Sequence, residues 1–497
     1  MDLLIIAVYC FFLTFILSYS ISQFSLALVF IKRKGEREMP GAFAAMAPKP
    51  YVTIQLPLFN EKYVAERLIR SVVALEYPKD KLEIQLLDDS TDETVEVVRA
   101  LVEELQGEGF LIEHIQRPNR VDYKAGALQY GLERCKGEFV AIFDADFLPD
   151  PKFLEYSLPH FEKAQVGVVQ TRWAHINENY SLLTKLQSYA LNAHFTVEQT
   201  GRNLNGHFIN FNGTAGIWRK ECIADAGGWQ GDTLTEDLDL SYRAQLRKWK
   251  FVFLQDVESP AELPAEMNAL KSQQYRWAKG AAECVVKNLK KVFVAPHLTL
   301  GTKVNAFFHL MNSFIWVCLL LSGLLLVPFL YVANKQAGYE GFMPFLVVYH
   351  FAFFALLLFY TQANATVSLR SGKDYLKFFI SYPAFLSLSM GLALHNAIGV
   401  FKGYLGIRSA FVRTPKFNIL NKRDGIEGKT YVKFKLDFVT VLEVLCFLYF
   451  CFGIYYAAMH ENYLALPFIL MQALGFATVL VYSFLHFRRA NGQSSGR

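Results

Sequence analysis

Four short polar signatures carry the residue types that could do chemistry in this 497-residue chain. In chain order they are Asp88-Asp89, Asp144-Ala145-Asp146, Thr235-Glu236-Asp237 and Gln273…Arg276-Trp277. The first two follow apolar runs and the third opens an amphipathic segment. The fourth spaces its side chains at i, i+3 and i+4, which is one face of a helix. We therefore expect a single site rather than scattered charge.

The second signature has the chemistry of a metal site. Asp144 and Asp146 lie one residue apart after the apolar run Phe139–Phe143. Such carboxylates hold hard cations, and Mg²⁺ or Mn²⁺ would in turn hold a diphosphate and stabilise its departure. A solvated turn is the alternative interpretation of Asp-x-Asp. The first signature has an alternative too, because Asp89 or Ser90 is also suited to cap the helix that follows.

The third signature predicts a general base. Asp237 would lie in the first turn of a helix, where the helix dipole favours the charged carboxylate. An ionised acid there can take a proton from an acceptor hydroxyl, which contributes on the order of 10²–10⁴ in rate. Glu236 and Asp237 as ordinary first-turn acids are the alternative.

The fourth signature combines a cation with a flat aromatic face. Arg276 can bind a diphosphate bidentately, and a sugar ring can stack on Trp277, although a Trp at a membrane interface can also be an anchor. Lys124, at another predicted helix start, would add a cation near phosphate, and ordinary packing of that helix start is the alternative.

The elements that must position these residues alternate between apolar runs and helical patterns. The predicted strands are Tyr51–Leu56, Glu83–Leu87, Phe110–Ile115, Phe139–Phe143, Val166–Arg172 and Phe251–Leu254, and the predicted helices between the first of them are Glu61–Leu75, Thr91–Leu105 and Lys124–Cys135. This alternation predicts an α/β fold with a doubly wound, mostly parallel sheet. Ligands of such sheets bind beyond the carboxyl ends of the strands, which is where both aspartate pairs fall.

Long apolar segments predict membrane helices on either side of this α/β region. Leu3–Ile31 ends at a basic cluster, and four more long apolar blocks follow residue 300: Ala306–Ala333, Phe342–Tyr360, Phe438–Met459 and Tyr463–Phe487. A signal peptide is the alternative for the first block, but the block is too long and lacks a basic start. By the positive-inside rule the basic flanks face the cytoplasm.

One weaker apolar block, Phe378–Val400, decides the predicted topology. Basic linkers lie on both sides of it, and a single crossing cannot join two cytoplasmic ends. We therefore expect an interfacial or re-entrant helix there, and five crossings in all.

Composition excludes several classes of protein. The net charge of +5 is small, and the basic residues cluster beside apolar blocks, which favours lipid head groups and anionic substrates over nucleic acid. The seven cysteines show no C-x-x-C spacing, so neither a zinc site nor a disulfide framework is predicted.

Taken together, the signatures resemble those of processive family 2 glycosyltransferases, the cellulose, hyaluronan and chitin synthase group, and within it the plant mannan and xyloglucan-backbone synthases of the cellulose synthase-like type and their bacterial relatives. The stretches that carry the resemblance are Gln55-Leu56-Pro57…Asn60-Glu61, Leu87–Asp92, Tyr123–Leu128, Gln170–Trp173, Phe211–Gly216 and Gln273–Trp277.

The resemblance implies a GT-A type fold and a role for each site residue. Asp88 and Asp89 would contact the nucleoside, Asp144 and Asp146 would hold Mg²⁺ or Mn²⁺, and Asp237 would be the catalytic base. The other implied substrate-binding residues are Lys124, Glu236, Gln273, Arg276, Trp277, Thr414 and Lys416. The family inverts configuration in one displacement, so an α-linked nucleotide sugar would give a β-linked product.

Phe411–Lys416 resembles the gating loop of cellulose synthases, within a loop that we expect over residues 403–430. Arg413 stands where that pattern has valine, and Val121-Asp122 departs from the glycine common in the plant group. Both departures fall close to the implied nucleotide contacts.

The sequence thus predicts residues 1–34 as a transmembrane helix, 35–300 as a cytoplasmic glycosyltransferase domain and 301–497 as transmembrane and interfacial helices. The expected function is a multi-pass enzyme of a plasma, inner or Golgi-type membrane that uses UDP-glucose or GDP-mannose to extend a β-linked glucan or mannan. A non-processive transferase that glycosylates a lipid such as ceramide is the alternative, and an inactive membrane scaffold is a third hypothesis. Glu443, inside a predicted span, would line a sugar-conducting pore or join two helices.

Overall fold

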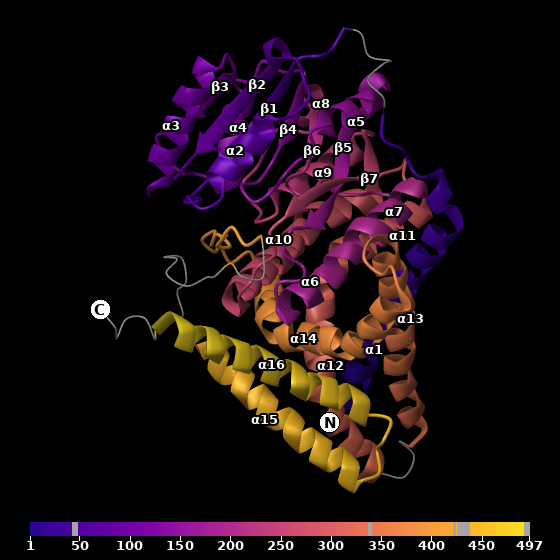
Figure 1. Cartoon of the computed structure of the whole chain (residues 1–497). Coiled ribbons are helices and arrows are strands. Elements are labelled where there is room, and N and C mark those ends of the chain that lie inside the picture. Colours follow the sequence, from indigo (N-terminus) through magenta and orange to yellow (C-terminus); the bar gives the residue numbers. More distant parts are fainter. Residues whose placement is uncertain (42–47, 336–339, 421–423, 425–437, 492–497) are drawn as a thin grey trace.

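The computed structural model describes residues 1–41, 48–335, 340–420, 424 and 438–491, and it places an α/β domain on one end of a bundle of long helices (Figure 1). A seven-stranded sheet in the order β3-β2-β1-β4-β6-β5-β7 forms the centre of the α/β domain. The strands are β1 (Val52–Leu58), β2 (Leu82–Asp88), β3 (Leu111–Ile115), β4 (Phe139–Ile142), β5 (Val166–His175), β6 (Gly216–Arg219) and β7 (Lys250–Ala261).

The sheet is mostly parallel, as the sequence predicts. Strand β1 runs parallel to β2 and β4, β2 to β3, and β5 to β7, whereas the short β6 is antiparallel to both β4 and β5. All six predicted strands are present. Strand β6 is not predicted, because four residues of the sequence Gly-Ile-Trp-Arg offer no alternation to detect.

Helices cover both faces of the sheet. On one face lie α2 (Ala65–Val73), α3 (Thr94–Gly107) and α5 (Phe153–Ser157), and on the other α4 (Tyr123–Leu132), α8 (Lys220–Asp225) and α9 (Glu236–Leu246). Successive residues of a strand point to opposite faces of the sheet. In β2, Leu86 belongs to the apolar core shared with α2, α3 and α5, and Leu87 belongs to the core shared with α4, α8 and α9. This division follows from the two-residue period of a strand.

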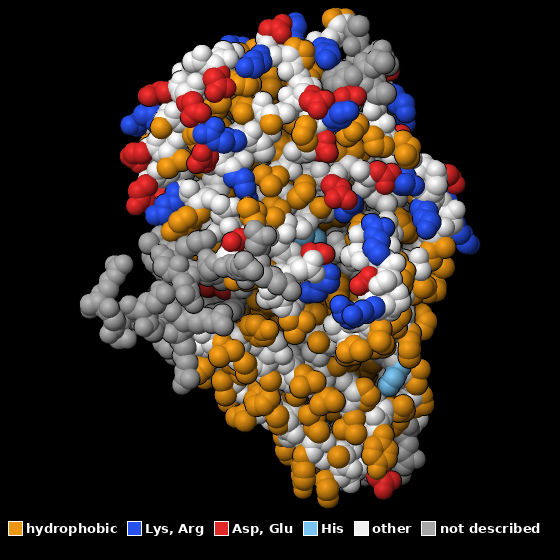
Figure 2. Space-filling view, viewed as in Figure 1, with side chains coloured by type: hydrophobic (Ala, Val, Ile, Leu, Met, Phe, Trp, Pro, Cys, Tyr) orange, Lys and Arg blue, Asp and Glu red, His pale blue; other side chains and the backbone are white. Residues whose placement is uncertain are grey.

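The long helices form the second part of the molecule. They are α1 (Asp2–Arg33), α11 (Leu300–Leu310), α12 (Phe314–Lys335), α13 (Val347–Val367), α14 (Gly372–Tyr404), α15 (Phe438–Met459) and α16 (Leu466–Asn491). Within the described residues, six helical segments are long and apolar enough to cross a membrane. Apolar side chains cover this bundle, whereas charged side chains gather over the α/β domain (Figure 2).

Helix α10 (Met267–Val294) joins the two parts, because its Ala278 and Ala282 belong to the same apolar core as the long helices. A further continuous segment, α6 (Leu182–Ala193), a π-helical turn (His194–Glu198) and α7 (Gln199–Leu204), runs close to the bundle (Figure 1).

The segment predicted as interfacial or re-entrant is one unbroken helix, α14, so the re-entrant form is wrong. Pro383 lies inside it without interrupting it. Of its most apolar stretch 67% is buried within the protein, against 17% for α15. Because α14 packs against α10 and α16, its polar residues Ser387 and Asn396 are buried by protein rather than exposed to lipid. The interfacial position of α14 stays a prediction.

Candidate active site

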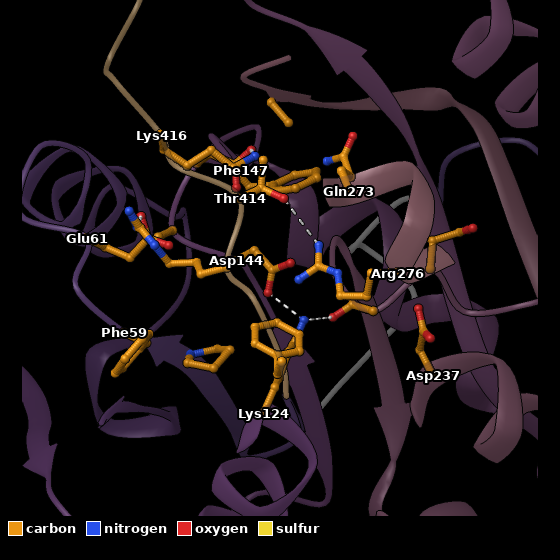
Figure 3. Close-up of a pocket in the computed structure, with 18 of the residues that line it drawn as sticks. Phe59, Glu61, Lys124, Asp144, Phe147, Asp237, Gln273, Arg276, Thr414 and Lys416 are labelled. Carbon is orange, nitrogen blue, oxygen red and sulfur yellow. Dashed lines mark hydrogen bonds and ion pairs between the residues drawn. The ribbon is translucent and has the colours of Figure 1, made fainter. Parts of the chain in front are cut away.

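A cavity of about 200 Å³ opens beyond the carboxyl ends of β1, β2 and β4, and all four signatures contribute to its wall (Figure 3). The predicted site residues that line it are Asp89, Lys124, Asp144, Asp146, Glu236, Asp237, Gln273, Arg276, Trp277, Thr414 and Lys416. The structure therefore brings together side chains that are up to 327 positions apart, from Asp89 to Lys416. Asp88 is the one predicted residue that is absent from the lining.

The two aspartates at the end of β2 have different environments. Asp88 is buried, where its carboxylate accepts a hydrogen bond from the Ser90 backbone N–H (2.9 Å) and lies 2.8 Å from His114 Nε2. Asp89 faces the cavity and pairs bidentately with Arg117, at 2.8 and 2.6 Å. Neither Asp89 nor Ser90 caps α3 with its side chain, so that alternative is wrong. Asp92 accepts the Thr94 N–H at the start of that helix instead.

Basic and aromatic groups complete the wall beside Asp89. The Arg120 guanidinium lies 3.3 Å from the centroid of the Phe59 ring, and Tyr123 stacks on Phe411. Asp122, which replaces the glycine of the plant group, has a φ of +58°, a conformation that glycine adopts without strain. Asp122 therefore adopts this turn at a backbone cost that glycine would not have.

The paired carboxylates at the end of β4 each meet one lysine. Lys124 Nζ lies 2.5 Å from Asp144 and donates to the Gly213 carbonyl oxygen at 2.8 Å, and Lys416 Nζ lies 2.5 Å from Asp146. The ammonium groups of Lys124 and Lys416 thus neutralise the two carboxylates, as a bound divalent cation would. This arrangement of charge fits a cation site. Among the described residues no cluster of three or more His, Cys, Asp or Glu side chains suits a metal. The remaining oxygen ligands would come from a diphosphate and water.

Asp237 lies in the first turn of α9, as predicted, and accepts the Leu238 N–H at 2.8 Å. Burial raises the pKa of Asp237 to about 7, the neighbouring Glu236 carboxylate adds to the rise, and the Lys124 ammonium opposes it. Burial therefore outweighs the helix dipole, which the sequence suggested would keep the group charged. A carboxyl with a pKa near neutrality is suited to exchange protons at physiological pH.

Gly213 makes room for this carboxylate. Its φ is +81°, and a Cβ there would lie 3.0 Å from Asp237 Oδ2 and 3.4 Å from Lys124 Nζ. A side chain at position 213 would therefore press on the proposed base as well as strain the backbone.

Arg276 reaches the loop that follows α14. Its guanidinium lies 4.6 Å from the centroid of the Phe411 ring, and its Nη2 is 3.5 Å from Thr414 Oγ1. Burial lowers the pKa of Arg276, although Glu236 and Asp144 oppose this. Of the expected loop over 403–430, residues 421–423 and 425–430 lie outside the described residues.

Arg413 gives the loop a contact that valine could not make. Its Nη1 lies 2.6 Å from Glu61 Oε2 inside the same cavity. Burial raises the pKa of Glu61 to about 7, and Arg413 opposes the rise. The departure from the family pattern thus joins the loop to the end of β1.

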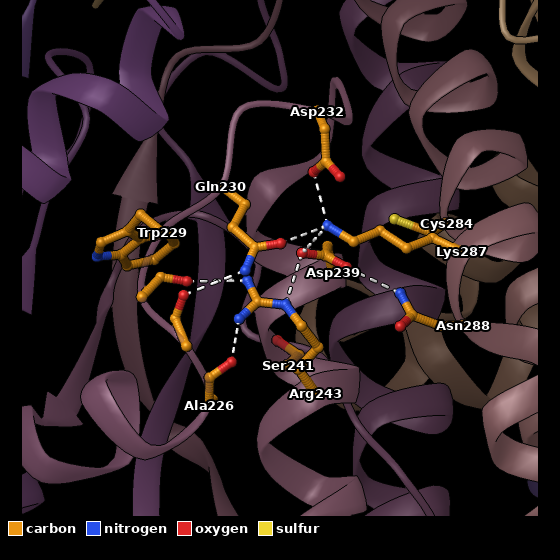
Figure 4. A network of polar contacts seen from close by, with 12 residues as sticks. Ala226, Trp229, Gln230, Asp232, Asp239, Ser241, Arg243, Cys284, Lys287 and Asn288 are labelled. Atoms are coloured by element: carbon orange, nitrogen blue, oxygen red, sulfur yellow. Dashed lines mark hydrogen bonds and ion pairs between the residues drawn. The ribbon is translucent and has the colours of Figure 1, made fainter.

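A polar network missed by the sequence argument fixes α9 against α10 (Figure 4). Asp239, fully buried, pairs with Arg243 at 2.8 Å and with Lys287 at 2.9 Å, and it accepts from Asn288 Nδ2 at 2.9 Å. Burial would raise the pKa of Asp239, but Arg243, Asn288 and Lys287 outweigh it and hold the pKa below its usual value. Because α9 carries Asp237 and α10 carries Arg276, the network fixes these two side chains relative to each other. The i, i+4 spacing of Asp239 and Arg243 was the available signal.

A second cavity, of about 410 Å³, begins at the same aspartate. Asp237, Asn212, Trp173 and Trp277 line both cavities. The second continues between the long helices, where its wall includes Ile16 and Tyr19 of α1, Ile315 of α12, Tyr349 of α13, Leu386 of α14 and Phe468 of α16. Glu443 lines neither cavity. It pairs with Lys271 of α10 at 2.6 Å, so the structure supports helix joining over the pore role.

A parallel half-sheet continued by an antiparallel strand, with aspartates directly after β4, is the architecture of a GT-A type glycosyltransferase. The model of the family described as glycosyltransferase like family 2 matches residues 48–280. The structure of the mannosyltransferase PcManGT from Pyrobaculum calidifontis, in complex with GDP-Man and Mn²⁺, covers 80% of this chain and 100% of its own, with a TM-score of 0.51 and 16% identity. That likeness concerns the fold.

Two plant proteins show the nearer relationship in sequence. Glucomannan 4-beta-mannosyltransferase 7 of Arabidopsis thaliana is 34% identical over 449 residues, which cover 87% of this chain and 76% of that protein. Glucomannan 4-beta-mannosyltransferase 1 of Oryza sativa subsp. japonica is 39% identical over 293 residues, 56% of each chain, so the match spans about half of that relative's length. The chain belongs to glycosyltransferase family 2, in its cellulose synthase-like group.

Proposed function

We propose that this chain is a membrane-embedded, inverting hexosyltransferase that transfers a sugar from a nucleotide donor to a growing β-linked polysaccharide. The observation that carries the proposal is the position of Asp237 where the two cavities meet. One cavity has the acids and cations that suit a nucleoside diphosphate sugar, and the other leads away between apolar helices. Transfer would take place at their junction.

In the proposed reaction Asp237 is the catalytic base. Its carboxylate takes the proton of an acceptor hydroxyl as the hydroxyl oxygen attacks the anomeric carbon of the donor sugar. The bond from that carbon to the diphosphate breaks on the opposite side, and its electron pair leaves with the diphosphate. A single displacement of this kind inverts the anomeric configuration.

On the donor side, Asp89 with Arg117 would contact the nucleoside, and Lys124, Arg276 and Lys416 would neutralise the diphosphate. Asp144 and Asp146 would hold Mg²⁺ or Mn²⁺, which when bound stabilises negative charge on the departing diphosphate. Thr414 and Gln273 would add hydrogen bonds.

On the acceptor side, Trp277 would offer a flat face to a sugar ring where the second cavity begins, and Trp173, which stacks on Phe195, lines the same junction. The names of the plant relatives favour a mannosyl donor such as GDP-mannose over UDP-glucose, and a polysaccharide acceptor over a lipid. Residues 1–34 would form a membrane helix, 35–300 the cytoplasmic transferase domain and 301–497 the remaining membrane and interfacial helices.

The test is a donor panel on the purified full-length chain in detergent or nanodiscs. Nucleotide release is measured with GDP-mannose, UDP-glucose and other nucleotide sugars in the presence of Mg²⁺ or Mn²⁺, and the product is sized and its linkages determined. The proposal expects one preferred donor and a β-linked polymer. Release of no nucleotide from any donor, or a single-sugar lipid as the only product, would overturn it.

A further inference from the structure

The wall of the second cavity contains a partly buried chain of polar and charged side chains that the proposed chemistry does not use. These side chains are Arg202, Glu198, His194 and Asn212, and they lead from α7 through the π-helical turn to the junction of the two cavities. His194, Glu198 and Asn212 line the second cavity, and Asn212 lines the first as well. A π-helical turn is rare inside an α-helix and occurs often at functional sites.

Both contacts of the His194 ring are short, and the contact between Arg202 and Glu198 is longer. His194 Nδ1 lies 2.8 Å from Glu198 Oε2, and His194 Nε2 lies 2.9 Å from Asn212 Oδ1. Arg202, which is 2% exposed, donates to the same Glu198 oxygen at 3.3 Å. Burial would raise the pKa of Glu198, but Arg202 and His194 outweigh it and lower the pKa to about 2, so this carboxylate is ionised.

These partners determine which groups the two ring nitrogens of His194 contact. An ionised carboxylate only accepts hydrogen bonds, so Nδ1 must donate to Glu198. Asn210 Nδ2 donates to Asn212 Oδ1 at 2.8 Å, which identifies that oxygen as the acceptor that faces Nε2. His194 thus bridges the Glu198 carboxylate and the Asn212 side chain through its two ring nitrogens.

The contact with His194 fixes the Asn212 carboxamide beside the proposed base. The next residue, Gly213, is so close to Asp237 that a Cβ on it would lie 3.0 Å from Oδ2. With Oδ1 held by His194 and Asn210, the Asn212 amide nitrogen has two hydrogens and, among the described residues, one weak partner, the Asn210 carbonyl at 3.3 Å. Within the part of the chain that the structure describes, the side-chain oxygens of Asn210 and Gln23, both on the wall of this cavity, are buried without a hydrogen-bond partner. A ligand rich in hydroxyl groups would satisfy all three.

We propose that His194 is a positioning residue for the acceptor sugar: held between Glu198 and Asn212, it orients the Asn212 amide toward a hydroxyl of the terminal sugar unit while another hydroxyl of that unit faces Asp237. The inference rests on the proposed function and adds a named acceptor contact to it. The ligand class is a β-linked hexose oligomer. His194 acts through Asn212 and does not touch the reacting atoms.

The experiment separates acceptor binding from donor chemistry. The full-length chain is assayed with its preferred nucleotide sugar, first without acceptor, as slow donor hydrolysis, and then with a β-linked oligosaccharide of the same sugar. The variants are His194→Phe, which removes both ring nitrogens, and His194→Gln, which retains one amide donor. His207→Phe is the matched control, because His207 contacts Thr302 and lines neither cavity.

We expect His194→Phe to raise the acceptor KM about 10-fold, because the hydrogen bond that holds Asn212 is lost, with donor KM and donor hydrolysis within about 2-fold of the parent. His194→Gln should lie between, and His207→Phe should match the parent. An unchanged acceptor KM in His194→Phe, or an equal rise in both KM values, overturns the inference.

If His194→Phe does not fold, as judged by size-exclusion chromatography, Glu198→Gln carries the test, since it keeps the side-chain shape and removes the carboxylate that holds the His194 ring. It should raise the acceptor KM alone, and an unchanged acceptor KM there also overturns the inference. A parent chain that releases no nucleotide from any donor would instead contradict the proposed function, so the two failures are distinguishable.

Discussion

Replacing Glu443 with leucine should destabilise the protein by removing the carboxylate that Lys271 faces. The pair joins α15 to the second turn of α10, two residues before Gln273, and its side chains are 10% (Lys271) and 0% (Glu443) exposed. The charges are 2.6 Å apart, and at an effective dielectric constant of about 20 their attraction is roughly 6 kcal/mol. Desolvation offsets much of this, so loss of one partner should cost about 3–5 kcal/mol.

The expected loss of stability arises because the buried Lys271 ammonium no longer faces the Glu443 carboxylate. A double-mutant cycle can isolate this contribution. Lys271→Met alone should be destabilising as well, whereas Lys271→Met combined with Glu443→Leu should recover most of the stability, because an apolar pair of similar volume needs no hydration. The measurement is thermal unfolding of the purified chain in one detergent. Lys335→Met, which removes a charge from an exposed position at the end of α12, is the control and should unfold like the parent.

The length of the polymer product distinguishes an ion-pair role of Glu443 from a pore-lining role. Glu443 lines neither cavity, so the stable double variant should make product of the parent's length. The reasoning is refuted if Glu443→Leu is as stable as the parent or if the double variant is as unstable as either single one. Shortened product from a stable double variant would restore the pore interpretation.

Three further predictions concern the site itself. Asp144→Asn and Asp146→Asn should each lower nucleotide release by about 10²-fold or more, and EDTA should do the same to the parent until Mn²⁺ is restored; full activity in EDTA would exclude the metal role. Gly213→Ala should lower kcat roughly 10-fold, because its Cβ would press on Asp237 Oδ2, and an unchanged kcat would show that this contact is unimportant. Because burial raises the pKa of Asp237 to about 7 and the base form is the ionised one, kcat/KM should rise with pH below about 7 and level off above it; a profile that is flat between pH 5.5 and 8 would contradict this.

The sequence predicted much of the fold because the patterns are local. A buried strand followed by an amphipathic helix repeats often enough between residues 50 and 150 to determine a parallel sheet, and the carboxyl ends of parallel strands bring Asp89 and Asp144 to one edge. The short antiparallel β6 and the unbroken α14 depend on tertiary contacts that no periodicity contains. In α14 the polar side chains are buried by packing against α10 and α16, whereas the sequence alone indicates only a weak membrane segment.

The candidate site, like the fold, was predicted where it depends on local patterns and not where it depends on tertiary contacts. The acids were predicted from their positions at strand ends and helix starts, and Arg276 from its helical spacing with Gln273 and Trp277, but the partners that set their chemistry were not predicted. The raised pKa of Asp237 comes mainly from burial, and the network around Asp239 depends on Lys287, 48 residues away. Arg413 was visible only as a departure from a pattern, and its contact with Glu61 across 352 residues gives that departure a physical meaning.

The central claim is that Asp237 is the base at the meeting point of a donor cavity and an acceptor cavity. The most direct measurement compares the parent chain with Asp237→Asn, in which the side chain keeps its size and loses its basicity. Nucleotide release in the presence of acceptor should fall by about 10²–10⁴, while the affinity for the nucleotide sugar, measured by calorimetry, stays within about 2-fold. Release within 10-fold of the parent, or loss of donor binding together with activity, would contradict the account.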